Sequence, residues 1–450
     1  MVEKQQFTEG GEKLSLDEVA ERVRGVSERL FVIDLFRPDQ ESAQEQKRAF
    51  LAGEVDEVRH EYSVLEGMDF EGLRREIGDL EVGLEGMEVA SKFVRPYRSS
   101  VRELQSRLDM VEAANNYRQS GGLEEARRFM EKNIELYGEP NRGTYEGLMG
   151  DLRKDALAKS FTGEAEKIRR ELLEVLPEVE GEREVFKPSD EAVGYANTLV
   201  NVLYEPFFEV IPEEQETFSS EDVAEVFHEI LHNGMGGAAD DWQVEISEKA
   251  KAMAVSPVRR VVTVPAGKEY DREKLEELVV HEIGVHVMRS VMGESNIEVL
   301  STGLSNYEEA EEGLAVGLEQ ALRGEYTDRG VPYYLMAGMK YFDNKTFRET
   351  FEVMWRRGVV ESLQDGEDVS SELVKKEQEL AYDRCLRIVR GTDDLPWFKD
   401  LTYYNGNVKF WSHIEKNNGN FNAVIAMFLG KIDYTNSEHI AAGMDAMPVN

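Results

Sequence analysis

The residues best suited to chemistry lie in the segment Leu278–Met288, which reads LVVHEIGVHVM. It holds two histidines, His281 and His286, and a carboxylate, Glu282, beside the first of them. Zinc binds imidazole nitrogen and carboxylate oxygen, and a catalytic zinc site keeps one position for water. Bound zinc lowers the pKa of that water to about 7, so that hydrolysis can run at neutral pH. The segment therefore predicts a zinc site in which Glu282 accepts the proton.

The spacing of the two histidines is unusual, because they are five residues apart and the common HExxH motif separates them by four. On a regular helix, five residues rotate a side chain by about 140°, which is too far for both rings to reach one ion. We therefore predict a helix deformed by a π-bulge, and Gly284 has no side chain to resist it. The alternative is a buried amphipathic helix whose histidines only satisfy hydrogen bonds in the core.

A second acidic segment, Glu311–Ala315, reads EEGLA and continues into an apolar run. The segment predicts a helix that presents a carboxylate inward, towards the histidines. Acidic residues also favour the first turn of a helix through its dipole, and composition alone favours that simpler role.

Three longer segments, VVHEIGVHVMR, LSTGLSNYEEAEEGLAVGLEQ and RIVRGTDDLPWFKDLTYYNGNVKFW, follow one another in this order. Together they resemble the metallopeptidase family with HExxxH and QEGLA motifs, which includes the microtubule-associated tyrosine carboxypeptidases. The resemblance implies that His281, His286 and Glu312 bind zinc and that Glu282 is the general base. This chain has Glu311 where the family motif has glutamine. Adjacent helical positions point about 100° apart, so only one of the two glutamates can reach the ion, and we expect Glu312.

A cationic segment lies further along the chain, where Arg384, Arg387 and Arg390 recur one helical turn apart. Arginine binds a carboxylate through two parallel hydrogen bonds, so this face can hold the terminal carboxylate of a peptide. An exposed stripe that pairs with surrounding acids is the alternative. Arg390 is our first choice for the carboxylate, because it adjoins Gly391, where backbone can approach a ligand closely.

The resemblance places Lys399, Tyr403 and Tyr404 near the same pocket. The predicted substrate-binding residues are Arg387, Arg390, Lys399 and Tyr404.

A literal HExxH motif occurs at His228–His232 and is a rival zinc site. Its spacing puts both histidines on one face of a helix. However, the helix that begins after Ser219 is predicted to stop at Asn233–Gly234, so His232 lies in its last turn. No helical carboxylate follows as a third ligand. We expect this segment to be a helix end that favours histidine through its dipole.

The composition limits the partners and the compartment. The chain has 53 basic and 90 acidic residues, a formal net charge of −37. Such a surface repels nucleic acid and anionic membranes, and it disfavours an acidic protein tail unless a local basic pocket overrides the field. The single cysteine, Cys385, excludes an internal disulfide framework. With no signal-like N-terminus and no long apolar run, we expect a cytoplasmic protein.

Residues from about 15 to 180 predict one helix after another. The predicted helices are 16–35, 44–65, 70–80, 99–114, 123–137 and 144–161. The charged segment 176–184 is the best linker, and we place a domain boundary near residue 185, before a helix capped by Ser189. Beyond it, 242–246 and 261–264 predict strands, and the latter is of the kind that pairs with extended substrate at a sheet edge.

These predictions combine into an α+β chain that is mainly helical. It has a helical N-terminal region, 1–185, and a zincin-like metallopeptidase domain with a small mixed sheet, 186–450. We expect a zinc-dependent carboxypeptidase that removes a C-terminal residue from peptides or proteins by metal-activated water. The alternative is a non-catalytic helical adaptor with a structural or degenerate metal site. A scaffold needs no glutamate beside its metal ligands, so Glu282 favours the enzyme.

Overall fold

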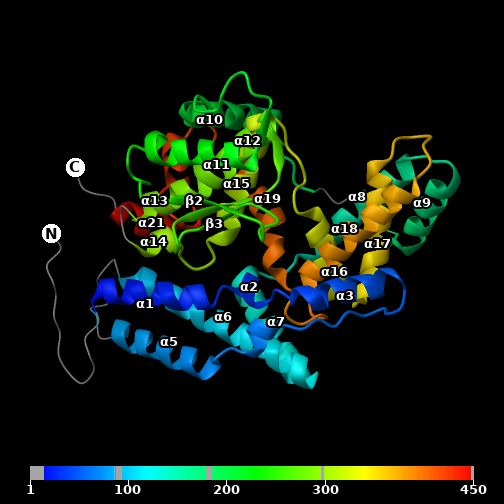
Figure 1. Ribbon diagram of the computed structural model, residues 1–450, viewed down its shortest axis with the longest axis horizontal. Coiled ribbons are helices and arrows are strands. Elements are labelled where there is room, and N and C mark those ends of the chain that lie inside the picture. The colour runs from blue at the N-terminus through cyan, green and yellow to red at the C-terminus, as the bar shows by residue number, and fades with distance from the viewer. Residues whose placement is uncertain (1–14, 86, 88–93, 179–184, 295–297, 447–450) are drawn as a thin grey trace.

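The computed structural model describes residues 15–85, 87, 94–178, 185–294 and 298–446 (Figure 1). Helices make up most of this part of the chain, and small sheets provide the remaining regular structure. The predicted helical α+β class with a small mixed sheet is therefore confirmed. Most of the buried hydrophobic residues fall into three clusters, and a few helices contribute to two of them.

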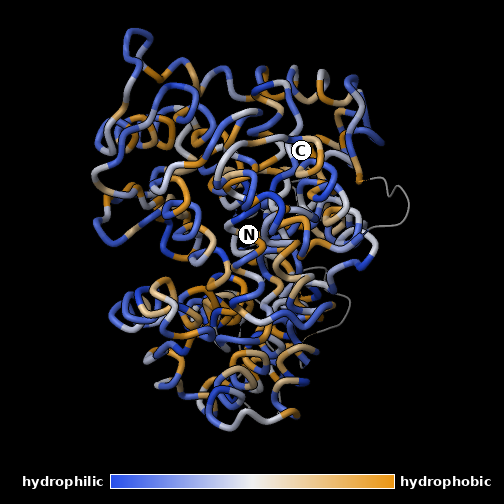
Figure 2. The backbone as a smooth tube through the Cα atoms, turned by 90° about the vertical axis from the view of Figure 1, so that its right-hand side faces the viewer, coloured by the Kyte–Doolittle hydropathy of each residue, from blue (hydrophilic) through white to orange (hydrophobic). Residues whose placement is uncertain are grey.

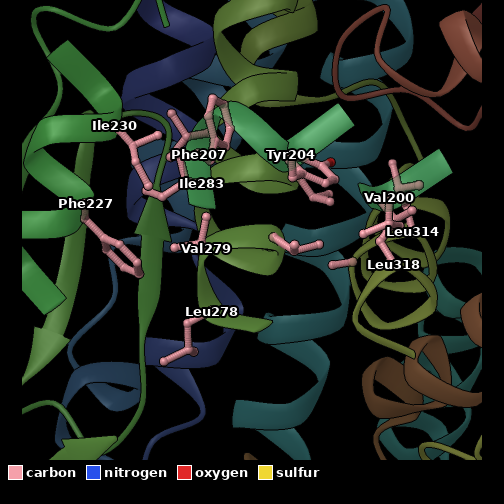
Figure 3. Packing of buried hydrophobic residues seen from close by; sticks show 14 of the residues in the cluster. Val200, Tyr204, Phe207, Phe227, Ile230, Leu278, Val279, Ile283, Leu314 and Leu318 are labelled. Atoms are coloured by element: carbon pink, nitrogen blue, oxygen red, sulfur yellow. The ribbon is translucent and has the colours of Figure 1, made fainter. Parts of the chain in front are cut away.

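The first cluster lies in the lobe that Figure 1 draws mainly in green. Figure 3 shows its centre, where Tyr204 and Phe207 lie close to Val279 and Ile283. The helical segments of this lobe are α10 (Asp190–Phe208), α11 (Ser220–Glu229), η1 (Ile230–Gly234), α12 (Arg272–Leu278), η2 (Val279–Val287), α13 (Met288–Glu294), α15 (Glu308–Arg323), α19 (Leu401–Lys416) and α20 (Phe421–Met427).

Side-chain caps fix where several of these helices begin. The Ser189 hydroxyl accepts from the Ala192 backbone N–H at the start of α10, as the sequence predicts. Ser219 and Asp222 form a capping box at the start of α11. Such caps satisfy backbone donors that the first helical turn leaves free.

The sheet of this lobe has the strand order β2-β4-β3, with β2 (Gln243–Ser247) parallel and β3 (Ala254–Ser256) antiparallel to β4 (Val261–Pro265). Both predicted strands are present. β4 is nevertheless central, so the expectation that it pairs with substrate at a sheet edge is wrong, because its neighbours already use its hydrogen-bonding groups. β3 is an edge strand and contacts η2. A separate antiparallel pair joins β1 (Thr217–Ser219) to β5 (Glu269–Asp271).

The second and third clusters combine early and late segments of the chain. Helices around the second are α3 (Gln40–Leu51), α8 (Arg142–Ala158), α9 (Gly163–Val175), α16 (Val331–Tyr341), α17 (Phe347–Ser362) and α18 (Ser371–Val389). Those around the third are α1 (Leu16–Arg29), α2 (Val32–Leu35), α4 (Ser63–Glu66), α5 (Phe70–Glu85), α6 (Val94–Ser120), α7 (Leu123–Tyr137), α14 (Val299–Thr302) and α21 (Ser437–Ala446). A short 3-10 turn, η3 (Phe398–Asp400), contacts α7, α16 and α19.

The N-terminal helices therefore share cores with residues beyond 185. The third cluster includes Leu300, Trp397 and Leu429, and the second includes Tyr382 and other late residues. In Figure 2 the hydrophilic stretches include many of the outer turns, as expected for helices that pack apolar faces together. The domain division near 185 stays a prediction, and residues 179–184 of the expected linker lie outside the described residues. In the described part of the chain, no helix has the length and apolar character needed to span a bilayer.

Two of the predicted N-terminal helices are interrupted, and those predicted at 70–80, 99–114 and 144–161 have other bounds, at Phe70–Glu85, Val94–Ser120 and Arg142–Ala158. The predicted helix 44–65 ends at Leu51, because Gly53 has a φ of 74°, a left-handed conformation in which glycine commonly ends a helix. The predicted helix 16–35 is broken into α1 and α2 around Leu30. The helix predicted at 123–137 has the predicted bounds.

Candidate metal centre

The predicted deformation of the histidine helix is confirmed. Val279–Val287 forms a π-helical segment between α12 and α13, longer than a single bulge. The i→i+5 hydrogen bonds of a π-helix bring residues five apart to one side of the segment. The rings of His281 and His286 accordingly lie with their centroids 4.9 Å apart.

Gly284 is required in this segment for a second reason, which the sequence does not reveal. The Tyr204 ring of α10 lies against its backbone, and a Cβ at position 284 would be 2.4 Å from a ring carbon. The Tyr204 hydroxyl also donates a hydrogen bond of 2.9 Å to the Gly284 carbonyl. The ring therefore fixes the π-helical backbone from the buried side (Figure 3).

Three of the predicted site residues come together at this point. One ligand atom each from His281, His286 and Glu312 lie within 4.8 Å of one another, and all three residues are partly buried. Among the described residues, these three side chains form the group that could hold a metal ion with all its ligand atoms within this distance. Two imidazoles and one carboxylate form a donor set that suits zinc and leaves a fourth position open.

Each histidine has a carboxylate of α15 at its Nδ1 atom. Glu311 Oε1 lies 2.7 Å from Nδ1 of His286 in a hydrogen bond. Glu319 Oε1 lies 2.9 Å from Nδ1 of His281, without the alignment of a hydrogen bond. This leaves Nε2 of each ring as the nitrogen available to an ion. Sequence reasoning missed Glu319, although it follows Glu312 by two helical turns and so shares its face.

Nearby carboxylates raise the pKa of His281. Burial alone would lower the pKa of His281, but Glu319, Glu282 and Glu312 raise it to about 9. Glu282 itself is 8 % exposed. No hydrogen bond or ion pair within the described ranges engages its carboxylate, which is therefore available as a base.

Glu311 is held away from the three-residue group by buried cations. Its carboxylate contacts Arg289 and Lys431, which are 0 % and 2 % exposed. Burial would raise the pKa of Glu311, but Lys431, His286 and Arg289 hold it well below its usual range. Glu312 is thus the glutamate of the pair that lies with the histidines.

Glycines in α15 allow α19 to pack directly against it. A Cβ at Gly313 would lie 2.1 Å from the backbone oxygen of Gly406, and one at Gly317 would lie 2.0 Å from the Phe410 ring. Such close contact places η3 and the start of α19 beside the metal-binding end of α15. The four-residue spacing of the two glycines was the available signal, because i and i+4 share a helical face.

Two side chains from this region lie close to Glu312. Burial would lower the pKa of Lys399, but Tyr403 and Glu312 raise it. The pKa of Tyr403 is raised to about 12, chiefly by the charge of Glu312. The Lys399 ammonium lies 5.6 Å from the Tyr403 ring centroid, and it forms no hydrogen bond or ion pair with any described residue.

The predicted arginines are more fully engaged. Arg387 donates to Asp400 Oδ1 at 2.8 Å and to the Tyr403 hydroxyl at 3.1 Å. Arg390 donates to the Arg387 carbonyl and lies over the Trp397 ring, and burial lowers its pKa.

The backbone at Gly391 gives no room to a ligand. The Phe36 ring occupies the space beside it, 2.5 Å from where a Cβ would lie. Our reason for preferring Arg390 is therefore wrong. Tyr404 is 4 % exposed, and its ring packs against Tyr334 with centroids 4.9 Å apart.

The rival HExxH segment lies on the surface. The His228 and His232 rings have centroids 4.2 Å apart, and Nδ1 of His232 is 3.6 Å from Asp240 Oδ1. The three do not form a group that meets the 4.8 Å limit within the described ranges. The helix ends where the sequence predicts, through a π-helical turn that reaches Gly234.

A comparison with known families gives one match. The family model described as microtubule-associated tyrosine carboxypeptidase matches residues 181–446. The match covers more than half of the chain and includes η2, α15, η3 and α19. No curated protein and no solved structure matches the chain.

Proposed function

Because this chain belongs to the microtubule-associated tyrosine carboxypeptidase family, we propose that it is a zinc-dependent carboxypeptidase. It removes one residue from the C-terminus of a peptide or protein. The observation that carries the proposal is the group formed by His281, His286 and Glu312, beside an unpaired Glu282. Two imidazoles and a carboxylate are a known ligand set of catalytic zinc sites.

The catalytic roles follow from the positions of the side chains. Zinc, when bound, polarises the substrate carbonyl and lowers the pKa of a water molecule. His281 and His286 hold the ion through Nε2, since their Nδ1 atoms face Glu319 and Glu311. Glu282 accepts the proton of the water and passes it to the leaving amine, a role that requires a carboxylate with no competing partner.

Recognition of the chain end needs a cation near the site, since an exopeptidase must distinguish a terminal carboxylate from an internal amide. Lys399 is now the first candidate, because its ammonium forms no hydrogen bond or ion pair with a described residue, lies 5.6 Å from the Tyr403 ring centroid and interacts with the charge of Glu312. A charge-assisted hydrogen bond to the carboxylate is stronger than a neutral one. Arg387 lies over the same Tyr403 ring as Lys399, whereas Arg390 and Tyr404 pack against Trp397 and Tyr334.

The family description points to tyrosine as the residue removed. Such a residue has an aromatic ring as well as a carboxylate. Tyr333 and Tyr403, with ring centroids 6.0 Å apart, lie under the Arg387 guanidinium and provide an aromatic surface near Lys399. In a chain of net charge −37, this local cationic and aromatic surface is what attracts an anionic chain end.

The fold around the site fits the same proposal. We propose that the lobe formed by the mixed sheet, η2 and α15 is a zincin-like catalytic domain, supported by the N-terminal helical region. β3 is the edge strand beside η2. An extended substrate can therefore pair with β3, as peptides do with exposed sheet edges.

The experiment compares pairs of peptides that differ only in having a free or an amidated C-terminus. Purified protein loaded with zinc is expected to remove one residue from the free acids and to leave the amides intact, as followed by mass spectrometry. Chelation should abolish the cleavage, and added zinc should restore it. Internal cuts, or equal cleavage of both peptides, would contradict the carboxypeptidase assignment.

A further inference from the structure

We infer that Glu311 is a positioning residue, which fixes the orientation of His286 and is itself held in place by Arg289 and Lys431. The inference rests on the proposed function, because it concerns how that site binds its zinc. Three charged residues, Glu311, Arg289 and Lys431, would then support the site without touching the substrate.

Both oxygens of the Glu311 carboxylate are used. Oε1 accepts from Nδ1 of His286 at 2.7 Å and from the Lys431 ammonium. Oε2 accepts from Nη1 of Arg289 at 3.1 Å. Because both oxygens are engaged, the carboxylate cannot turn towards the metal site without breaking these contacts. It can therefore act only through the imidazole of His286.

The two cations are fixed by backbone contacts. Arg289 lies on α13, directly after η2, and its other Nη atom donates to the Ile432 carbonyl. The backbone at Lys431 pairs in both directions with the region of α14, donating to Leu300 O at 2.7 Å and accepting from Leu304 N at 3.0 Å. Contacts among α13, the segment at Lys431 and the region of α14 thus define where Glu311 lies. Its hydrogen bond to His286 is therefore preorganised.

A carboxylate, and not an amide, is needed at position 311. Glutamine could accept from His286 through its oxygen, but its NH2 group would then face Lys431 or Arg289. Both cations are almost completely buried, and a buried charge without its partner is strongly unfavourable. The negative charge of Glu311 and the positive charges of Lys431 and Arg289 therefore compensate one another.

Glu319 provides an internal comparison, because it stands in the same relation to His281. Its contact lacks hydrogen-bond alignment, and its other neighbour, Arg329, is 3.9 Å away and half exposed. Groups that orient a metal-ligating histidine typically change metal affinity by about 10- to 100-fold. We expect Glu311 to act near the upper end of that range and Glu319 near the lower end.

The test measures zinc affinity by competition with a chelator and the absorption spectrum of the cobalt-substituted protein. Glu311→Gln combined with Lys431→Met removes one buried charge of each sign. It is expected to weaken zinc binding by about 10- to 100-fold and to alter the cobalt bands. Lys431→Met alone loosens Glu311 but leaves its contacts with His286 and Arg289, so zinc affinity should fall by less than in the double variant, below about 10-fold. Glu311→Asp, which keeps the charge but shortens the side chain, is the second variant if the double variant does not fold.

The outcomes separate this inference from the proposed function. Wild-type zinc affinity and an unchanged cobalt spectrum in a folded double variant, or in Glu311→Asp, would overturn the positioning role. Weakened zinc binding in these variants, in a protein that trims no peptide, would overturn the proposed function and leave the positioning role standing. A wild-type protein that binds no zinc would overturn both.

Discussion

Two segments of this chain place a glutamate directly after a histidine and a second histidine beyond it, and both pass through π-helical turns. In the buried segment, HEIGVH, the rings are 4.9 Å apart, and in the exposed segment, HEILH, they are 4.2 Å apart. The distance between the two histidine rings is thus similar in the two segments. What differs is the element that faces them.

The buried segment packs against α15, which brings Glu311, Glu312 and Glu319 to the two rings. The exposed segment faces a loop that offers only Asp240, at 3.6 Å. The glutamates differ too, because Glu229 accepts a hydrogen bond from the Asn233 side chain, whereas Glu282 is buried and unpaired within the described chain. A histidine motif of standard spacing therefore does not by itself predict a metal site, because the remaining ligand must come from a second helix.

The largest expected effect concerns the metal itself. His281→Ala should reduce zinc content from one equivalent to none, because it removes one of the three ligands that come together among the described residues. His228→Ala should leave the equivalent of zinc in place. Elemental analysis of the purified proteins measures both, and loss of zinc from the His228 variant alone would exchange the roles of the two segments.

The next effect concerns the two glutamates. Glu282→Gln should retain zinc and lower peptide turnover by about 10²- to 10⁴-fold, the usual contribution of a general base. Glu229→Gln is the matched control, since it makes the same change in the exposed segment, and its turnover should equal that of the wild type. A Glu282→Gln enzyme with full activity would mean that another group takes the proton.

The sequence allowed the main features of the site to be predicted, because they depend on spacing. Histidines five positions apart demand a deformed helix, and a π-helical segment is present. The order of histidines, paired glutamates and cations along the chain also indicated which segments belong together. The zinc ligands and the general base stay predictions until metal content and activity are measured.

What could not be predicted depends on contacts between distant segments. Lys431 lies 120 residues beyond Glu311, and no local pattern marks it as a partner. The Phe36 ring occupies the space at Gly391, which removed the reason for choosing Arg390. The helix end at Leu51 depends on Gly53, and an apolar pattern that continues past a glycine does not reveal such an end.

A further difference is that the charges of Lys399 and Glu312 interact beside the buried segment, whereas the exposed segment has Asp240 near His232. Lys399→Met should lower kcat/KM on free-acid peptides by about 10- to 150-fold, equivalent to losing about 1.5–3 kcal/mol of a hydrogen bond to a charged group. Zinc content should not change. Equal losses on acid and amide peptides would show that Lys399 does not read the carboxylate, and Arg390→Ala tests the earlier choice in the same assay.

The smallest expected effect is on stability and zinc binding, and it differs between Gly284 and Gly234, the glycines of the two π-helical segments. Alanine normally stabilises a helix relative to glycine by about 1 kcal/mol. At position 284 the added Cβ would lie 2.4 Å from the Tyr204 ring, and overpacking of this kind costs about 1–3 kcal/mol. At position 234 the nearest contact is the Cγ2 methyl of Ile230, at 3.3 Å, which a shift of a few tenths of an ångström relieves. We therefore expect Gly284→Ala to lower the urea midpoint and weaken zinc binding, since a displaced Tyr204 releases the Gly284 carbonyl from its hydrogen bond. Gly234→Ala should leave both nearly unchanged. Equal behaviour of the two variants would mean that the backbone between His281 and His286 is not fixed by Tyr204.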